Sequence, residues 1–338
     1  MLFFLLAFIG LCLYGVKFNL KNNSRFEDYL SLEKTTSIKG IFIIIVFFSH
    51  FNKYFTPINM MDSLYFKLIS EIGQNMVVAF LFYSGFGVME SIQKKGTPYL
   101  QQMPKNRMLR VLFEFQIATI FSLVYNFLAN EQLNFEKILL YFISWENWYI
   151  FAILCLYTFT FLGFRWLKKN QYHKGIFLVA LLTVGYILVM RQLKSRFWYD
   201  TVLCYPLGML WSLYKDKIKL RNIYQWGAAV LSVLVAAVLL KVFAKESLIA
   251  VLIGFLLSCI FIVLCTMRIS FHNKVLYWSG KYLFEIYILH RIFQSFVKET
   301  GIITFNLYLA FVICAVLTAV SAFYFEKGFK KLWGRIST

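Results

Sequence analysis

Two polar residues in one apolar segment have the types and the spacing for acid–base chemistry beside a bound anion. Lys39 opens and His50 closes a run that is otherwise mostly Ile, Val and Phe. On a helix, eleven residues are about three full turns and a rise of roughly 16 Å, so both side chains lie on one face. An ammonium group binds anions, and a neutral imidazole can take a proton from a hydroxyl or an amine. The alternative interpretation of His50 is a histidine that only hydrogen-bonds neighbouring backbone.

A second basic pair suits phosphate. Arg107 and Arg110 are three residues apart, and Glu114 follows four residues later. These offsets place the side chains on one face of a regular helix. Guanidinium groups bind phosphate oxygens in bidentate fashion, but basic residues here also fit the rule that cytoplasmic loops of membrane proteins are positively charged. The positions alone favour the two interpretations equally.

The remaining candidates are weaker. Ser84 belongs to the segment Phe82–Phe86, whose small residues normally serve helix packing; a surface for substrate approach is the minority interpretation. Glu146 and Asp200 begin apolar segments, and either acid could orient His50 or bind a sugar hydroxyl, although a solvated span end fits each as well. Further candidates for substrate binding are polar or aromatic residues in these and one later segment: Trp148, Tyr149, Tyr287 and His290.

The elements that hold these residues must be membrane helices. The chain has 338 residues, of which 60% are hydrophobic and 15% charged, whereas soluble domains are about 45–50% apolar and about 25% charged. This composition excludes an ordinary soluble protein, a disordered chain and a coiled coil. Because about 20 apolar residues span a bilayer as a helix, the predicted fold is all-α, a polytopic membrane helical bundle of about 11 transmembrane helices.

Apolar runs bounded by charged residues give the predicted spans. They lie near residues 2–18, 38–55, 72–92, 109–128, 146–164, 175–190, 198–214, 226–243, 247–267, 282–297 and 302–325.

The charge distribution predicts the orientation. Most of the 35 Lys and Arg residues fall in alternate connections, which the positive-inside rule assigns to the cytoplasm. The N-terminus is then outside and the C-terminus inside. Three positive residues on the outer side, Arg191, Lys194 and Arg196, break the rule. They indicate either a misplaced span or a site for an anionic partner.

The net charge of +19 does not predict nucleic-acid binding, because the sequence has no basic helix with interleaved polar residues and no base-reading module. The six cysteines lie in apolar runs without close-spaced partners. They are typical of packing residues, so we expect neither a disulfide framework nor a metal site.

Four motifs in order resemble the integral-membrane acyltransferase family 3, whose members include O-acetyltransferases of bacterial surface polysaccharides. They are Lys39-Gly40 leading to His50, the F-x-S-G-F type segment Phe82–Phe86, Arg107-x-x-Arg110, and the segment Glu285–His290. Two positions depart from the family pattern. Thr36 stands where an acid is common, and Lys39 stands where Arg is commoner, so phosphate would meet a point charge without the guanidinium fork.

The resemblance implies an acyl-CoA-dependent acyltransferase of the bacterial cytoplasmic membrane. Lys39, Arg107 and Arg110 would bind the phosphates of cytosolic acyl-CoA, most simply acetyl-CoA. His50 would act as general base on a hydroxyl of a cell-surface or lipid-linked glycan, and both direct transfer and an acyl-histidine intermediate stay open. Besides the lipid bilayer, the glycan acceptor and the donor, polysaccharide-biosynthesis proteins are candidate partners.

The predicted organisation is an N-terminal transmembrane anchor and cytoplasmic linker (1–32) followed by the acyltransferase domain (33–338), with ten family-like helices and one additional N-terminal helix. Two other functions stay open. A transporter or flippase for a lipid-linked glycan predicts that substitution of His50 is tolerated. A structural partner of a polysaccharide synthase predicts that glycan synthesis survives loss of Lys39, His50, Arg107 and Arg110.

Overall fold

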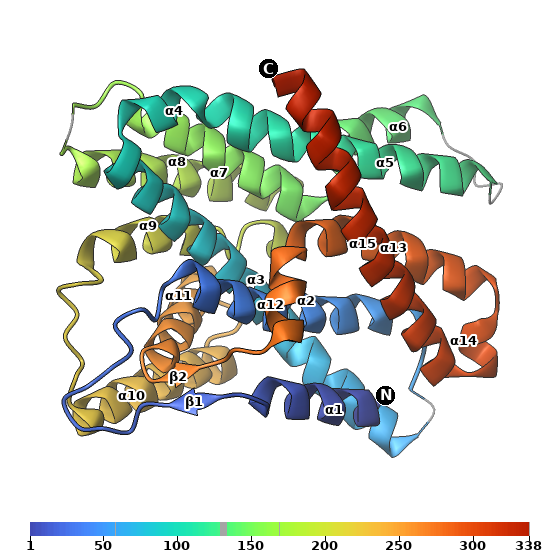
Figure 1. The fold of residues 1–338 in the computed structure, drawn as a ribbon, viewed down its shortest axis with the longest axis horizontal. Helices are drawn as coiled ribbons and strands as arrows, with labels where there is room; N and C mark the ends of the chain where they lie inside the picture. The colour runs from blue at the N-terminus through green and yellow to red at the C-terminus, as the bar shows by residue number, and fades with distance from the viewer. Residues whose placement is uncertain (58, 129–133, 169, 338) are drawn as a thin grey trace. The chain divides into compact units, whose positions relative to one another are not determined.

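The computed structural model describes residues 1–57, 59–128, 134–168 and 170–337. The described chain is helical apart from turns, loops and two short strands, β1 (Lys17–Phe18) and β2 (Ile269–Ser270). The strands pair antiparallel, with Lys17 opposite Ser270 (Figure 1). The prediction of an all-α helical bundle is confirmed.

The contacts divide the chain into two compact units. Unit 1 contains residues 1–19, 26–76 and 266–338, and unit 2 contains residues 20–25 and 77–265. Helix α3 (Met60–Lys95) begins in unit 1 and continues into unit 2. This division concerns packing, and the predicted domain boundary at residue 32 stays a prediction.

Unit 1 is built on aromatic packing. Its other helices are α1 (Leu2–Leu13), α2 (Leu32–Phe51), α12 (Lys274–Lys281), α13 (Leu283–Glu299), α14 (Ile302–Phe305) and α15 (Leu307–Ser337). Ser31 caps the N-terminus of α2: its hydroxyl accepts from the backbone N–H of Lys34 at 3.4 Å, which satisfies one of the free donors of a helix N-terminus. In the core, the ring of Phe311 on α15 contacts Phe48 and Phe51 on α2.

Unit 2 holds the rest of the bundle. Its helices are the second part of α3, α4 (Thr97–Met103), α5 (Arg110–Leu128), α6 (Phe135–Phe142), α7 (Trp148–Phe164), α8 (Tyr172–Leu193), α9 (Cys204–Tyr214), α10 (Ile223–Phe243) and α11 (Leu248–Thr266). A π-helical turn, Pro104–Leu109, joins α4 to α5. One core cluster of this unit surrounds Tyr186 and Trp198.

The surface fits a membrane environment. Within the described residues, six helical segments are long and apolar enough to cross a bilayer. Helix α10 has no buried residue, and its exposed side chains include Leu231 and Val242. Exposed apolar surface of this extent matches lipid as the solvent. Each of the eleven predicted spans overlaps a helix, but α9 has only 11 residues, so the number of crossings stays a prediction.

Small residues let α3 and α9 approach closely. A Cβ atom added at Gly85 would lie 2.0 Å from the backbone oxygen of Tyr205, and one added at Gly208 would lie 2.0 Å from that of Phe82. At Gly87, two residues further along, an added Cβ would meet no atom within 4 Å outside its own stretch of helix. Gly85 in the F-x-S-G-F type segment therefore serves backbone contact between helices.

We predict that Gly85→Ala lowers stability whereas Gly87→Ala does not. The new methyl group in the first variant must push α3 away from α9, and overpacking of this kind costs about 1–3 kcal/mol. Thermal unfolding of the purified proteins in detergent measures the difference. Equal midpoints for the two variants would contradict the packing described here.

Candidate functional site

Helix α2 contains both Lys39 and His50 without a break. It lies against α12 by backbone contact, because an added Cβ at Gly40 would be 1.9 Å from the carbonyl oxygen of Leu276. The contact is reciprocal, since a Cβ at Gly280 would be 1.8 Å from the carbonyl oxygen of Thr36. The glycine that follows Lys39 is therefore required by packing. It fixes where Lys39 and His50 lie within unit 1.

His50 contacts a second histidine. Its Nδ1 lies 2.6 Å from Nε2 of His290 on α13, and the Nδ1 of His290 lies 2.9 Å from the carbonyl oxygen of Ile286. His290 is fully buried and His50 is half-buried. The two histidines, 240 residues apart in sequence, thus form one pair (Figure 1 shows α2 and α13).

The surroundings of the pair are aromatic and cationic. The ring of His290 lies near those of Phe47 and buried Tyr287, and the charges of Lys53 and Arg291 act on both histidines. One turn beyond His290, the Nε2 of buried Gln294 donates to the carbonyl oxygen of Phe47 at 3.2 Å. This bond ties α13 to α2 next to the histidine pair.

In unit 2, a tyrosine lies near two other predicted site residues, Ser84 and Arg107. Ser84 Oγ lies 2.9 Å from the hydroxyl of Tyr157, and Tyr157 is also an electrostatic neighbour of Arg107. Tyr205, another neighbour of Arg107, has its hydroxyl 2.9 Å from Thr160 Oγ1. The Arg107 guanidinium, its phenol neighbours and the serine hydroxyl that contacts Tyr157 form a polar patch inside this unit. It provides hydrogen-bond donors for an anionic group.

The helix around the two arginines differs from the regular one assumed from sequence. Arg107 lies in the π-helical turn, and Arg110 is the first residue of α5. Pro104 begins that turn and has no backbone N–H to donate, and π-turns interrupt α-helices at such places. The offset of three residues therefore does not place Arg107 and Arg110 on one α-helical face, whereas the offset of four from Arg110 to Glu114 lies within α5.

The two acids predicted at span ends differ in burial. Glu146 is exposed, whereas Asp200 is buried at 6% exposure. Trp148 is half-buried with its ring 6.2 Å from that of Phe197, and Tyr149 is buried. The contact at Nδ1 of His50 comes from His290. The roles of Glu146 and Asp200 toward a base or a sugar stay predictions.

Two of the three cations predicted to lie on the outer side, Lys194 and Arg196, have partners within unit 2. The ammonium of Lys194 lies 4.5 Å and 4.6 Å from the ring centroids of Trp145 and Trp198, an arrangement that stabilises a cation. Arg196 donates to the carbonyl oxygens of Lys245 and Ser247. These contacts give both residues a structural role that the charge rule does not predict.

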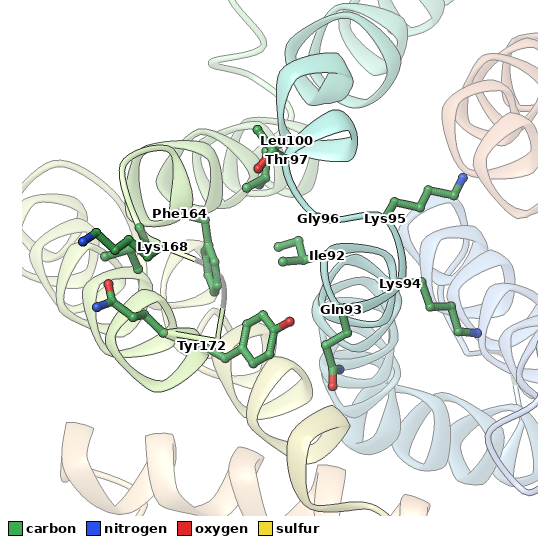
Figure 2. Close-up of a pocket in the computed structure, with 12 residues that line it drawn as sticks. Ile92, Gln93, Lys94, Lys95, Gly96, Thr97, Leu100, Phe164, Lys168 and Tyr172 are labelled. Carbon is green, nitrogen blue, oxygen red and sulfur yellow. The ribbon is translucent and has the colours of Figure 1, made fainter.

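A cavity of about 320 Å³ lies between the ends of α3 and α7 and the starts of α4 and α8. Figure 2 shows Ile92, Phe164 and Tyr172 around its interior, with the lysine side chains running outward at the rim. Its lining includes three lysines, Lys94, Lys95 and Lys168, and no acidic residue. An aromatic interior with a basic rim suits an anionic ligand. The sequence assigned these lysines only to topology.

Sequence reasoning missed Tyr157, Tyr205 and Thr160 as members of the Arg107 patch. Their only signal was a hydroxyl inside an apolar helix, which many packing tyrosines and threonines share. As for metals, no group of three or more His, Cys, Asp or Glu residues within the described ranges is placed to hold an ion.

A family model described as an acyltransferase domain matches residues 36–326. The chain belongs to this acyltransferase family. The match contains the histidine pair, Lys39 and the Arg107 patch. No curated protein and no solved structure matches the chain. Together with the apolar helices, the family indicates a multi-pass membrane acyltransferase.

Proposed function

We propose that this acyltransferase moves an acyl group, most simply acetyl, from acyl-CoA to a hydroxyl of a cell-surface or lipid-linked glycan. The observation that carries the proposal is the contact of His50 with His290 inside a chain of this family. A histidine held by a hydrogen bond within an apolar helix has the form of a general base. A solvated or purely packing histidine would not need a second polar ring at 2.6 Å.

The proposed reaction transfers one proton, forms one bond and breaks another. His50 takes the proton of the acceptor hydroxyl as the oxygen attacks the thioester carbonyl carbon. The new C–O ester bond forms, the C–S bond breaks, and the thiolate leaves with the proton that His50 releases. Coenzyme A with a free thiol and the acylated glycan are the products. In the alternative route, His50 itself attacks the thioester and then passes the acyl group to the hydroxyl.

Donor binding requires cations on the cytosolic side, because the phosphates of acyl-CoA carry several negative charges. Lys39, Arg107 and Arg110 are the proposed ligands of these phosphates. The cavity rimmed by Lys94, Lys95 and Lys168 adds further positive charge at connections predicted to be cytoplasmic. Arg107 would bind a donor phosphate with a guanidinium that already has phenol groups as neighbours.

Acceptor binding is proposed for aromatic and hydroxyl groups. Trp148 and Tyr149 would stack on a sugar ring, with Ser84, Tyr287 and the exposed carboxylate of Glu146 as partners for hydroxyls. The protein would lie in the bacterial cytoplasmic membrane with its N-terminus outside and its C-terminus inside. The glycan would reach it from the outer side or the bilayer, alone or with polysaccharide-biosynthesis proteins.

We predict that His50→Ala abolishes acyl transfer while the protein stays folded in the membrane. Loss of a general base costs about 100-fold to 10,000-fold in rate. The measurement is free-thiol release from acetyl-CoA in the presence of a cell-envelope glycan extract, with the exposed His173→Ala variant as control. Near-normal release by folded His50→Ala would contradict the mechanism, whereas no release from the folded wild type would favour a glycan transporter.

We predict that Arg107→Ala combined with Arg110→Ala raises the KM for acyl-CoA. The donor phosphates lose two guanidinium partners, each of which contributes charge-assisted hydrogen bonds. The control is Lys331→Ala with Arg335→Ala, which removes two exposed positive charges from a predicted cytoplasmic segment. If the first double variant had the same donor dependence as the control, the phosphate assignment would be wrong.

A further inference from the structure

The hydrogen bonds of the histidine pair determine where its protons lie. The carbonyl oxygen of Ile286 can only accept a hydrogen bond, so Nδ1 of His290, at 2.9 Å, must carry the proton and donate it. A neutral imidazole has one N–H group. The Nε2 of a neutral His290 therefore has a lone pair and acts as an acceptor.

The second bond follows from the first. Nδ1 of His50 lies 2.6 Å from Nε2 of His290, so it must be the nitrogen that carries hydrogen in a neutral pair. The ring planes differ by 11° and the ring centroids are 4.8 Å apart. That separation is close to the largest that a 2.6 Å nitrogen–nitrogen contact permits, so the rings meet edge to edge and the hydrogen bond lies in both ring planes.

The remaining nitrogen, Nε2 of His50, then has a lone pair. Two charged groups act on the pair, Lys53 from the turn after α2 and Arg291 from α13. Both are donors only, so neither can replace His290 as the acceptor for the Nδ1–H of His50. Tyr287, the titratable neighbour on α13, has its ring centroid 6.0 Å from that of His290.

We propose that His290 is a positioning residue that holds His50 in the tautomer with hydrogen on Nδ1, so that Nε2 is the basic nitrogen. The assignment of catalysis to His50 rests on the proposed function, whereas the tautomer rests on the hydrogen bonds alone. A carboxylate orients the histidine in the Ser–His–Asp arrangement. Here a neutral imidazole does so, which avoids burying an anion in an apolar bundle.

The pair can also share the proton that catalysis delivers. When His50 takes a proton at Nε2, its Nδ1–H still faces the lone pair of His290, and the positive charge is stabilised by that acceptor. One proton taken up from solvent at the same Nε2 removes the base. Activity is therefore expected to fall at low pH with the uptake of a single proton.

The tautomer is measurable without any activity. The chain contains four histidines, so selective nitrogen-15 labelling of the imidazoles in the full-length protein in nanodiscs gives four ring systems. Single His→Gln variants of His173, His272 and His290 assign them. With the pair neutral, the proposal predicts that His50 and His290 both carry hydrogen on Nδ1. Hydrogen on Nε2 of His50 would overturn it, whether or not acyl transfer is observed.

Kinetics test the positioning role. We expect His290→Phe, which keeps a ring but has no acceptor, to lower kcat by on the order of 10-fold to 100-fold, part of a general-base contribution of about 100-fold to 10,000-fold. The KM for acyl-CoA should not change. His290→Gln, whose amide oxygen can accept from Nδ1 of His50, should recover activity, with an acid limb shifted in pH from that of the wild type.

The two variants also separate the possible failures. Equal activity of folded His290→Phe and wild type would overturn the positioning role. Equal loss in His290→Phe and His290→Gln, with the same acid limb as wild type, would reduce His290 to a packing residue. Absence of thiol release from the wild type itself would contradict the proposed function, while the nitrogen-15 spectra would still decide the tautomer.

Discussion

The backbone contact of α2 with α12 is the constraint on which the arrangement of unit 1 depends. Gly40 and Gly280 meet backbone carbonyl groups of the opposite helix, and neither position has room for a Cβ atom. Because α13 follows α12 after a single residue, this contact also restricts where α13 begins. The pairing of His50 with His290 and the bond from Gln294 to Phe47 are consequences of that placement. A bulkier residue in the contact would move the base as well as the helix.

Several polar groups inside the two units are held by other polar groups or by aromatic rings. His290 has Ile286 and His50, Tyr157 has Ser84, and Lys194 lies beside two indole rings. A membrane interior penalises unsatisfied polar groups, so such pairs allow an apolar bundle to contain ionisable side chains. The same pairing orients them, which is the property that proton transfer and anion binding require.

The sequence predicted what depends on local periodicity and composition. A membrane bundle followed from apolar content, and a helix joining Lys39 to His50 followed from the uninterrupted apolar run. The partner of His50 was out of reach, because His290 is 240 residues away and spacing carries no information about contacts between distant helices. The π-helical turn at Pro104 was missed for a different reason. A regular helix was assumed over residues 107–114, so Arg107 and Arg110 were placed on one face, whereas Arg107 lies in a π-helical turn that begins before this stretch.

An experimental structure with acetonyl-CoA, in which a methylene group separates the sulfur from the carbonyl, tests the central claim that acyl transfer takes place at His50. If transfer takes place there, the carbonyl carbon of this analogue lies on the Nε2 side of His50, with space for one hydroxyl oxygen between them. A bound analogue whose carbonyl lies away from His50, or on its Nδ1 side, would contradict acyl transfer at this residue.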